Sequence, residues 1–124
     1  MTYIISPTKE PADILEAAIQ NIKKNGWCKG KYSDYNGAVC MLGAINVSID
    51  GNPDGWGVNN KKDTLRRSIA ENYIRPLLDT PNTGIPYFND NSTTTREDVI
   101  NILRKAAALA RVKDETNSDL SSRS

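Results

Sequence analysis

The amino-acid sequence predicts a mainly α-helical protein, a small compact bundle of about four helices joined by long ordered loops. Three stretches carry apolar residues three and four positions apart, which is the spacing of one buried helix face. A fourth stretch, residues 38–47, is apolar on nearly every side and indicates a buried central element. The length of 124 residues suits one domain, which we place at 1–112, followed by a polar, disordered tail at 113–124.

The first helix is expected from Pro11 to Asn25. Pro11 suits the first turn, where its missing N–H is not needed. Gly26 suits the position after the last helical residue, where a left-handed backbone often ends a helix and turns the next residue, Trp27, back onto Ile22. The expected apolar stripe comprises Ile14, Leu15, Ala18, Ile19 and Ile22.

The apolar stretch 38–47 is interpreted as a central helix. Gly43 and Ala44 would let a neighbouring helix approach closely on one side. A buried strand is the alternative, because periodicity alone does not separate a short buried strand from a buried helix.

A third helix is expected from about Asp63, with an apolar ladder at every fourth position. Pro76 should end or kink this helix near Ile74, because proline disfavours a helical conformation in the residue before it. The ladder consists of Leu65, Ile69, Tyr73 and Leu77.

Residues 79–93 show no regular pattern and are predicted to form a loop that Ile85, Tyr87 and Phe88 hold against the core. The last helix is expected to open at Thr94, because Thr94 and Glu97 have the spacing of a capping box.

The composition excludes several kinds of chemistry. Histidine is absent, which removes Ser-His-Asp and Cys-His catalysis and most zinc sites. The net charge of +1 gives no overall attraction to nucleic acid or to an anionic membrane. Two cysteines, Cys28 and Cys40, are too few for a secreted disulfide framework. They could pair once, but reduced thiols are the simpler interpretation. No cofactor or metal is predicted, and without a signal peptide or a membrane span we expect a cytoplasmic protein.

The loop that follows the central element resembles half of a calcium-binding loop. Asp50, Asn52, Asp54 and Gly55 match its first six positions. Position 12 is Lys61, however, where calcium needs a bidentate carboxylate. A plain turn therefore explains this loop better.

Two surfaces are candidates for function. The first is a ligand-binding pocket or patch that joins the end of the first helix to the 79–93 loop, with Trp27, Cys28, Phe88, Asn89 and Asp90. The second, an alternative, is a nucleic-acid or nucleotide-binding patch of Lys61, Lys62, Arg66 and Arg67 at the start of the third helix. A third hypothesis is an enzyme that uses Cys28 or Asp90.

Three segments together resemble an uncharacterised family of small proteins of bacteriophages and actinobacteria, a domain of unknown function. The first segment runs from Trp27 to Gly30 as W-C-x-G and the second reads C-x-L-G-A from Cys40. The third is Phe88-Asn89-Asp90, where the family more often shows W-N-D, before the last helix. The resemblance covers roughly residues 12 to 110 and implies an accessory protein of a phage or mobile element that acts in the cytoplasm of a bacterial host cell.

From these observations we expect a small binding protein without enzymatic activity, which recognises a host protein or a small metabolite. Nucleic acid is a possible partner but not the favoured one, and no membrane partner is expected.

Overall fold

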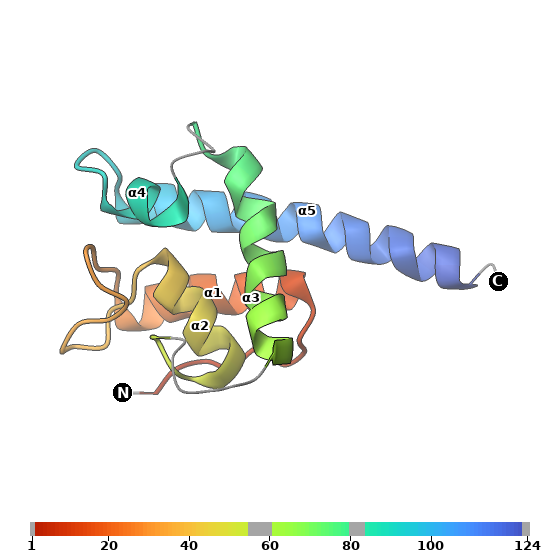
Figure 1. Cartoon of the computed structure of the whole chain (residues 1–124), viewed down its shortest axis with the longest axis horizontal. Coiled ribbons are helices and arrows are strands. Elements are labelled where there is room, and N and C mark those ends of the chain that lie inside the picture. Colours follow the sequence, from red (N-terminus) through yellow and green to blue (C-terminus); the bar gives the residue numbers. More distant parts are fainter. Residues whose placement is uncertain (1, 55–60, 80–83, 123–124) are drawn as a thin grey trace.

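The computed structural model describes residues 2–54, 61–79 and 84–122, with side chains described as far as Lys113. The mainly helical prediction is confirmed, with five α-helices in these ranges where about four were expected (Figure 1). They are α1 (Pro11–Asn25), α2 (Met41–Asp50), α3 (Lys61–Ile74), α4 (Gly84–Asp90) and α5 (Arg96–Ser122), with a short 3-10 helix η1 (Arg75–Leu77) after α3.

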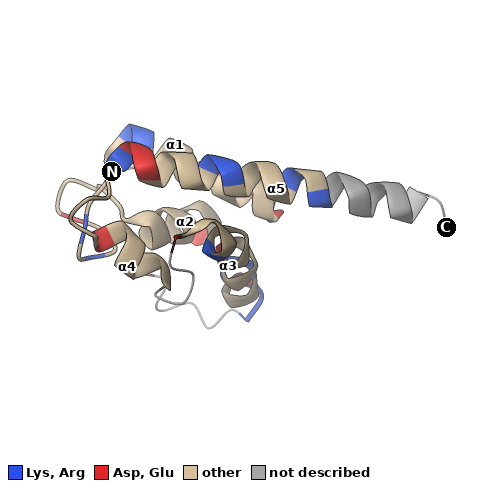
Figure 2. Ribbon diagram, turned by 90° about the horizontal axis from the view of Figure 1, so that it is seen from above, with Lys and Arg blue, Asp and Glu red and all other residues tan. Residues whose placement is uncertain are grey.

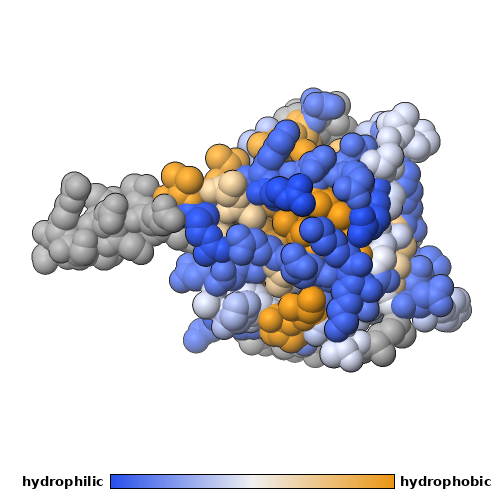
Figure 3. All heavy atoms as spheres, turned by 180° about the vertical axis from the view of Figure 1, so that it is seen from behind, coloured by the Kyte–Doolittle hydropathy of each residue, from blue (hydrophilic) through white to orange (hydrophobic). Residues whose placement is uncertain are grey.

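The helices form two layers. Helices α1 and α5 lie on one level, and α2, α3 and α4 lie below them (Figure 2). The most extensive contacts join α1 to α5 and α1 to α2. Helix α1 is therefore the centre of the bundle, and α5 extends well past the other helices (Figure 1). Seen from behind, hydrophilic side chains cover most of the described surface and separate small apolar patches (Figure 3).

Helix α1 has the bounds that the sequence predicts. All five residues of its expected stripe are buried, and Ala12 and Ala17 are buried as well, because α2 and α5 cover two sides of the helix. Gly26 follows the last helical residue with the positive φ that the sequence predicts, 100°, but its ψ of 171° lies outside the left-handed helical region. The chain leaves α1 in an extended conformation, and Trp27 pairs in parallel with Val39. A side chain at Gly26 would also press on Ala38, 3.2 Å away.

Helix α2 confirms the helical interpretation of the central stretch, although residues 38–40 precede it in an extended conformation. Cys40 is the N-cap residue, and its Sγ accepts a hydrogen bond from the Gly43 N–H at 3.3 Å. The expectation of a helix packed over Gly43 is wrong. The space beside Gly43 is filled by the backbone of Tyr32, whose carbonyl oxygen lies 2.1 Å from where a Cβ would be.

The predicted ladder of α3 faces the core only in its second half. Leu65 and Ile69 are exposed, whereas Tyr73 and Leu77 are partly buried against the core. Ala70 and Ile74, which flank the ladder in the sequence, are fully buried and form the innermost row of this helix. Pro76 ends the helix as predicted. Helix α3 stops at Ile74, and the chain continues as the 3-10 helix η1.

Two predictions near the last helix need correction. Residues 84–90, expected as an irregular loop, form helix α4, and Pro86 is tolerated there because the first turn of a helix needs no N–H partner. The cap of α5 lies one residue later than expected. Thr95 Oγ1 accepts from the Asp98 N–H at 3.2 Å, and Asp98 Oδ2 accepts from the Thr95 N–H at 3.0 Å. Thr94 is buried instead.

Helix α5 is assigned as far as Ser122. The side chains that follow Lys113 lie outside the described residues. The expectation of a disordered tail at 113–124 therefore stays a prediction.

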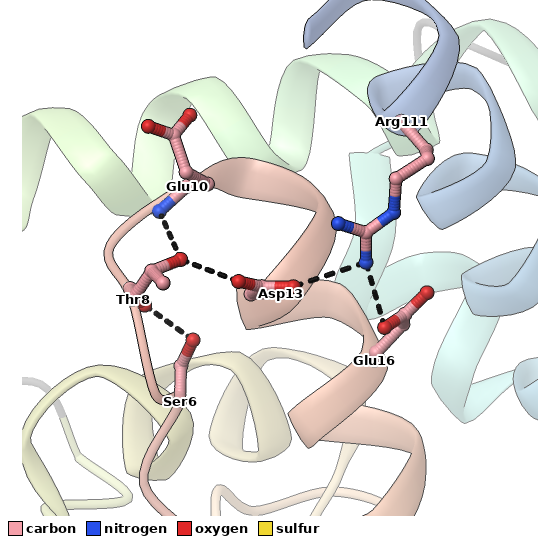
Figure 4. A network of polar contacts seen from close by, with 6 residues as sticks. All are labelled: Ser6, Thr8, Glu10, Asp13, Glu16 and Arg111. Atoms are coloured by element: carbon pink, nitrogen blue, oxygen red, sulfur yellow. Dashed lines mark hydrogen bonds and ion pairs between the residues drawn. The ribbon is translucent and has the colours of Figure 1, made fainter. Parts of the chain in front are cut away.

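A polar network joins the start of α1 to α5 (Figure 4). The Arg111 guanidinium donates to Asp13 at 3.0 Å and to Glu16 at 2.8 Å. The second Asp13 oxygen accepts from the Thr8 hydroxyl. These contacts, first the Thr8 hydrogen bond and then Arg111, lower the pKa of Asp13.

Replacing Arg111 with glutamine should lower the free energy of unfolding by roughly 0.5–1 kcal/mol, because the pairs are partly exposed. A lowered folded-state pKa stabilises the fold above the pKa of the unfolded carboxyl, and this stabilisation is lost as the pH falls through the folded value. Urea unfolding at pH 7 and pH 3 should show the difference between the proteins shrinking at low pH. Arg96→Gln, which breaks an exposed pair with Glu97, is the control and should have a smaller effect. An equal loss in both variants would contradict the prediction.

Candidate functional site

A single buried side chain, Asn89 on α4, connects three segments that are far apart in the sequence. Its Oδ1 accepts from the indole N–H of Trp27 at 2.7 Å and from the backbone N–H of Met41 at 3.0 Å. Its Nδ2 donates to the carbonyl oxygen of Cys28 at 3.1 Å and to Asp90 Oδ1 at 2.9 Å. Asn89 is 1% exposed, so these bonds replace all of its contact with water. We call this set the Asn89 junction.

The loop after α1 is also attached to the end of α4. Asp90 Oδ1 accepts from the Gly30 N–H at 2.9 Å. The Lys29 ammonium donates to the carbonyl oxygen of Asn91 at 2.7 Å and lies 5.2 Å from the centre of the Trp27 ring. The two segments of the predicted ligand-binding patch therefore meet in space.

A pocket of about 170 Å³ opens beside the Asn89 junction, between the loop after α1, the start of α2 and helix α4. Leu42, Ile85 and Pro86 provide much of its apolar surface. Its polar groups include one carboxylate and one ammonium. The full lining is Gly30, Lys31, Tyr32, Cys40, Leu42, Ile85, Pro86, Asn89 and Asp90.

The structure divides the five predicted ligand-binding residues. Asn89 and Asp90 line the pocket, whereas Trp27 and Cys28 support it from behind through their bonds to Asn89. Phe88 lies elsewhere, in a second pocket between α4 and α5.

Several pocket residues were not singled out by sequence reasoning. Cys40 and Leu42 belong to the C-x-L-G-A segment, but their apolar neighbours made them look like core residues. Ile85 and Pro86 belong to the short helix that the sequence did not predict. No signal in the sequence pairs these positions with the loop after α1.

Both cysteines are protonated at neutral pH. Burial, the nearby Cys40 thiol and Asp34 raise the pKa of Cys28 to about 11. Its Sγ lies 3.5 Å from the carbonyl oxygens of Lys31 and Ala38, to which it donates. Burial likewise raises the pKa of Cys40. A cysteine that acts as a nucleophile at neutral pH needs a lowered pKa, so neither thiol is activated at that pH.

The alternative basic patch occupies the first two turns of α3 (Figure 2). The Arg66 guanidinium forms an ion pair with the Asp63 carboxylate at 2.7 Å. This pairing weakens the attraction of Arg66 for a phosphate group. The patch comprises Lys61, Lys62, Arg66 and Arg67. Nothing in their arrangement tests the nucleic-acid hypothesis.

The half-matched calcium loop is a series of turns where it is described. Asp50 accepts from the Asn52 N–H at 2.9 Å, and Asn52 accepts from the Asp54 N–H at 3.1 Å. Residues 55–60 of this loop lie outside the described residues. Within the described ranges, no group of three or more acidic or cysteine side chains is placed to hold a metal ion.

In the described part of the chain, no helix has the length and apolar character needed to cross a membrane.

Comparisons with known proteins identify a family but no characterised relative. No curated protein and no solved structure matches the chain. Residues 6–109, which include all three segments of the Asn89 junction, match a family of unknown function, DUF6197. The chain therefore belongs to the DUF6197 family, as the resemblance to an uncharacterised domain implied.

Proposed function

We propose that the protein binds a small organic molecule in the pocket beside the Asn89 junction and has no catalytic activity of its own. The observation that carries this proposal is the convergence of three distant segments on one pocket through a fully hydrogen-bonded, buried amide. A pocket whose walls are fixed before binding loses little conformational entropy when a ligand enters.

The size of the pocket limits the ligand to about one ring. Its volume of about 170 Å³ is close to that of cavities of about 150 Å³ that take up benzene in other proteins. Leu42, Ile85 and Pro86 give such a ring an apolar surface to pack against. A pocket of this size favours a small metabolite over a host protein as the partner, because a protein partner needs a broad interface.

The polar lining favours a ligand that donates hydrogen bonds or carries positive charge. One oxygen of Asp90 is occupied by Gly30 and Asn89, whereas its Oδ2 has no partner among the described residues. The Lys31 ammonium lies 6.0 Å from the centre of the Tyr35 ring, which competes for it. We therefore propose a single aromatic or heterocyclic ring with an amino or amidinium group directed at Asp90.

The biological setting that we propose is an accessory protein of a phage or mobile element, acting in the cytoplasm of a bacterial host. This part of the proposal rests on the resemblance of the three segments and not on the pocket. Two other partners compete with a small molecule as the proposed ligand. One is a host protein, and the other is a nucleic acid bound at the start of α3.

The test uses benzamidine as the probe and benzoate as its anionic counterpart. In ¹H–¹⁵N NMR titrations of the full chain, benzamidine should shift the amides of residues 30–32, 40–42, 85 and 87–90, and benzoate should not. Asp90→Asn keeps the acceptor for Gly30 but removes the charge, so benzamidine affinity should fall roughly tenfold. Leu42→Trp should fill the pocket and abolish binding.

Asp79→Asn is the matched control, because Asp79 is exposed and lies outside the pocket. It should bind benzamidine like the wild type. Equal shifts with benzoate, or shifts confined to other surfaces, would contradict the proposal. Native mass spectrometry of protein purified from its host would then show whether a protein or nucleic acid is bound instead.

A further inference from the structure

We propose that Cys28 and Cys40 form a dithiol site that a low-molecular-weight disulfide oxidises reversibly to an intramolecular disulfide. The structure holds both residues as free thiols, which is the reduced form of this site. The proposal is independent of the identity of the pocket ligand.

The backbone pairing places the two cysteines side by side. Val39 N–H donates to Gly26 at 3.0 Å and Cys28 N–H donates to Val39 at 3.2 Å, which makes Trp27 and Val39 a parallel pair. Cys28 and Cys40 each follow one member of that pair. Successive residues of an extended chain point to opposite faces, so both cysteines project on the face opposite Trp27 and Val39.

The spacing of such neighbours suits a disulfide. Adjacent extended chains lie about 4.8 Å apart, and disulfides join Cα atoms about 4.4–6.8 Å apart. The influence of the Cys40 thiol on the pKa of Cys28 agrees with this proximity. Oxidation therefore needs a rotation of the side chains and no rearrangement of the fold.

The two thiols differ in access, which sets the order of the reaction. Cys28 is partly exposed, whereas Cys40 is 8% exposed. The Cys28 thiolate attacks one sulfur of oxidised glutathione, which forms a mixed disulfide and releases one glutathione. The Cys40 thiolate then attacks the Cys28 sulfur and releases the second glutathione. Two thiols and one disulfide thus give one protein disulfide and two thiols, and two electrons pass from the protein to glutathione.

Oxidation would act on α2 and on the pocket together. In the reduced form Cys40 Sγ caps α2 by accepting from Gly43, and it also lines the pocket. A bond to Cys28 turns this sulfur toward the loop after α1. We therefore expect the oxidised form to lose the Sγ cap and to present a changed pocket wall.

The experiment is oxidation of the full chain with oxidised glutathione at pH 8.5, followed to completion because the high pKa of Cys28 slows attack at lower pH. The expected product is a monomer about 2 Da lighter than the reduced chain, which dithiothreitol restores. Cleavage with trypsin after Lys24, Lys29 and Lys31 separates the cysteines, since residues 25–29 carry Cys28 and residues 32–61 carry Cys40. The disulfide should therefore appear as these two peptides joined.

Cys28→Ser and Cys40→Ser are the controls, and each should stop at a glutathione adduct on the remaining thiol or stay reduced. Stable glutathione adducts on wild-type protein would overturn the proposal. Covalent dimers in place of the lighter monomer, or thiols that stay free after complete exposure to the oxidant, would do so as well. Benzamidine binding plays no part in these readouts, so the pocket proposal and the dithiol proposal can fail separately.

Discussion

Replacing Asn89 with alanine is expected to lower the free energy of unfolding by about 4 kcal/mol. The change leaves the Met41 N–H without its partner at a buried position, and the Trp27 indole N–H and the Cys28 carbonyl oxygen without theirs at partly buried positions. Each buried polar group left without a bond costs roughly 1–3 kcal/mol. Urea unfolding followed by tryptophan fluorescence and by far-ultraviolet circular dichroism measures the loss.

Asn72→Ala is the matched control, because Asn72 is exposed and its one side-chain bond within the described residues is the one it accepts from Arg75 along α3. It should change the unfolding free energy by less than about 0.5 kcal/mol. Trp27→Phe removes one bond of the Asn89 junction, so its effect should not add to that of Asn89→Ala in a double-mutant cycle. Full additivity would mean that Asn89 does not hold Trp27.

Replacing Gly43 with alanine should destabilise the protein by about 3 kcal/mol, although alanine is the better helix former. In an exposed helix this change would stabilise by about 1 kcal/mol. At Gly43 the added Cβ would lie 2.1 Å from the carbonyl oxygen of Tyr32, so the loop after α1 must move away from α2. Thermal and urea unfolding of the variant give the sign and the size of the effect.

Gly51→Ala provides the comparison, since Gly51 ends α2 with φ 83° and, of the residues that the structure describes, a Cβ there would meet the end of the Ile5 side chain at 3.5 Å. Its cost should be roughly 1–2 kcal/mol, from the left-handed backbone alone. If Gly43→Ala is as stable as the wild type, the loop is not held against α2 as the structure describes.

Local sequence signals predicted the elements that depend on local interactions. Helix α1 was predicted to the residue, because proline, the apolar stripe and glycine all indicate the same bounds. The cap of α5 was placed one residue early, because Thr94 with Glu97 and Thr95 with Asp98 have the same spacing. Helix α4 was missed because seven residues with a glycine and a proline show no helical period.

The candidate site was predicted only in part, because its geometry depends on contacts between distant residues. The sequence suggested that Trp27 and Asn89 share a surface, and their hydrogen bond spans 62 positions of the chain. It gave no reason to place Cys40 and Leu42 in the same pocket, since the apolar residues that line a pocket are of the same types as those that form a buried core. A helix was expected to approach closely at Gly43, but the backbone of Tyr32, in the loop after α1, lies there instead.

The pairing of α1 with α5 constrains the order in which the chain can fold during synthesis. Asp13 and Arg111 meet across 98 positions, which a ribosome adding about 10 residues per second covers in about 10 s. Helix α2 is available early and covers one side of α1, but the side that faces α5 stays open to water until the last helix emerges. The nascent chain therefore exposes an apolar strip of α1 for several seconds before α5 can cover it. A chaperone that binds exposed apolar segments has time to bind α1 before α5 packs against it.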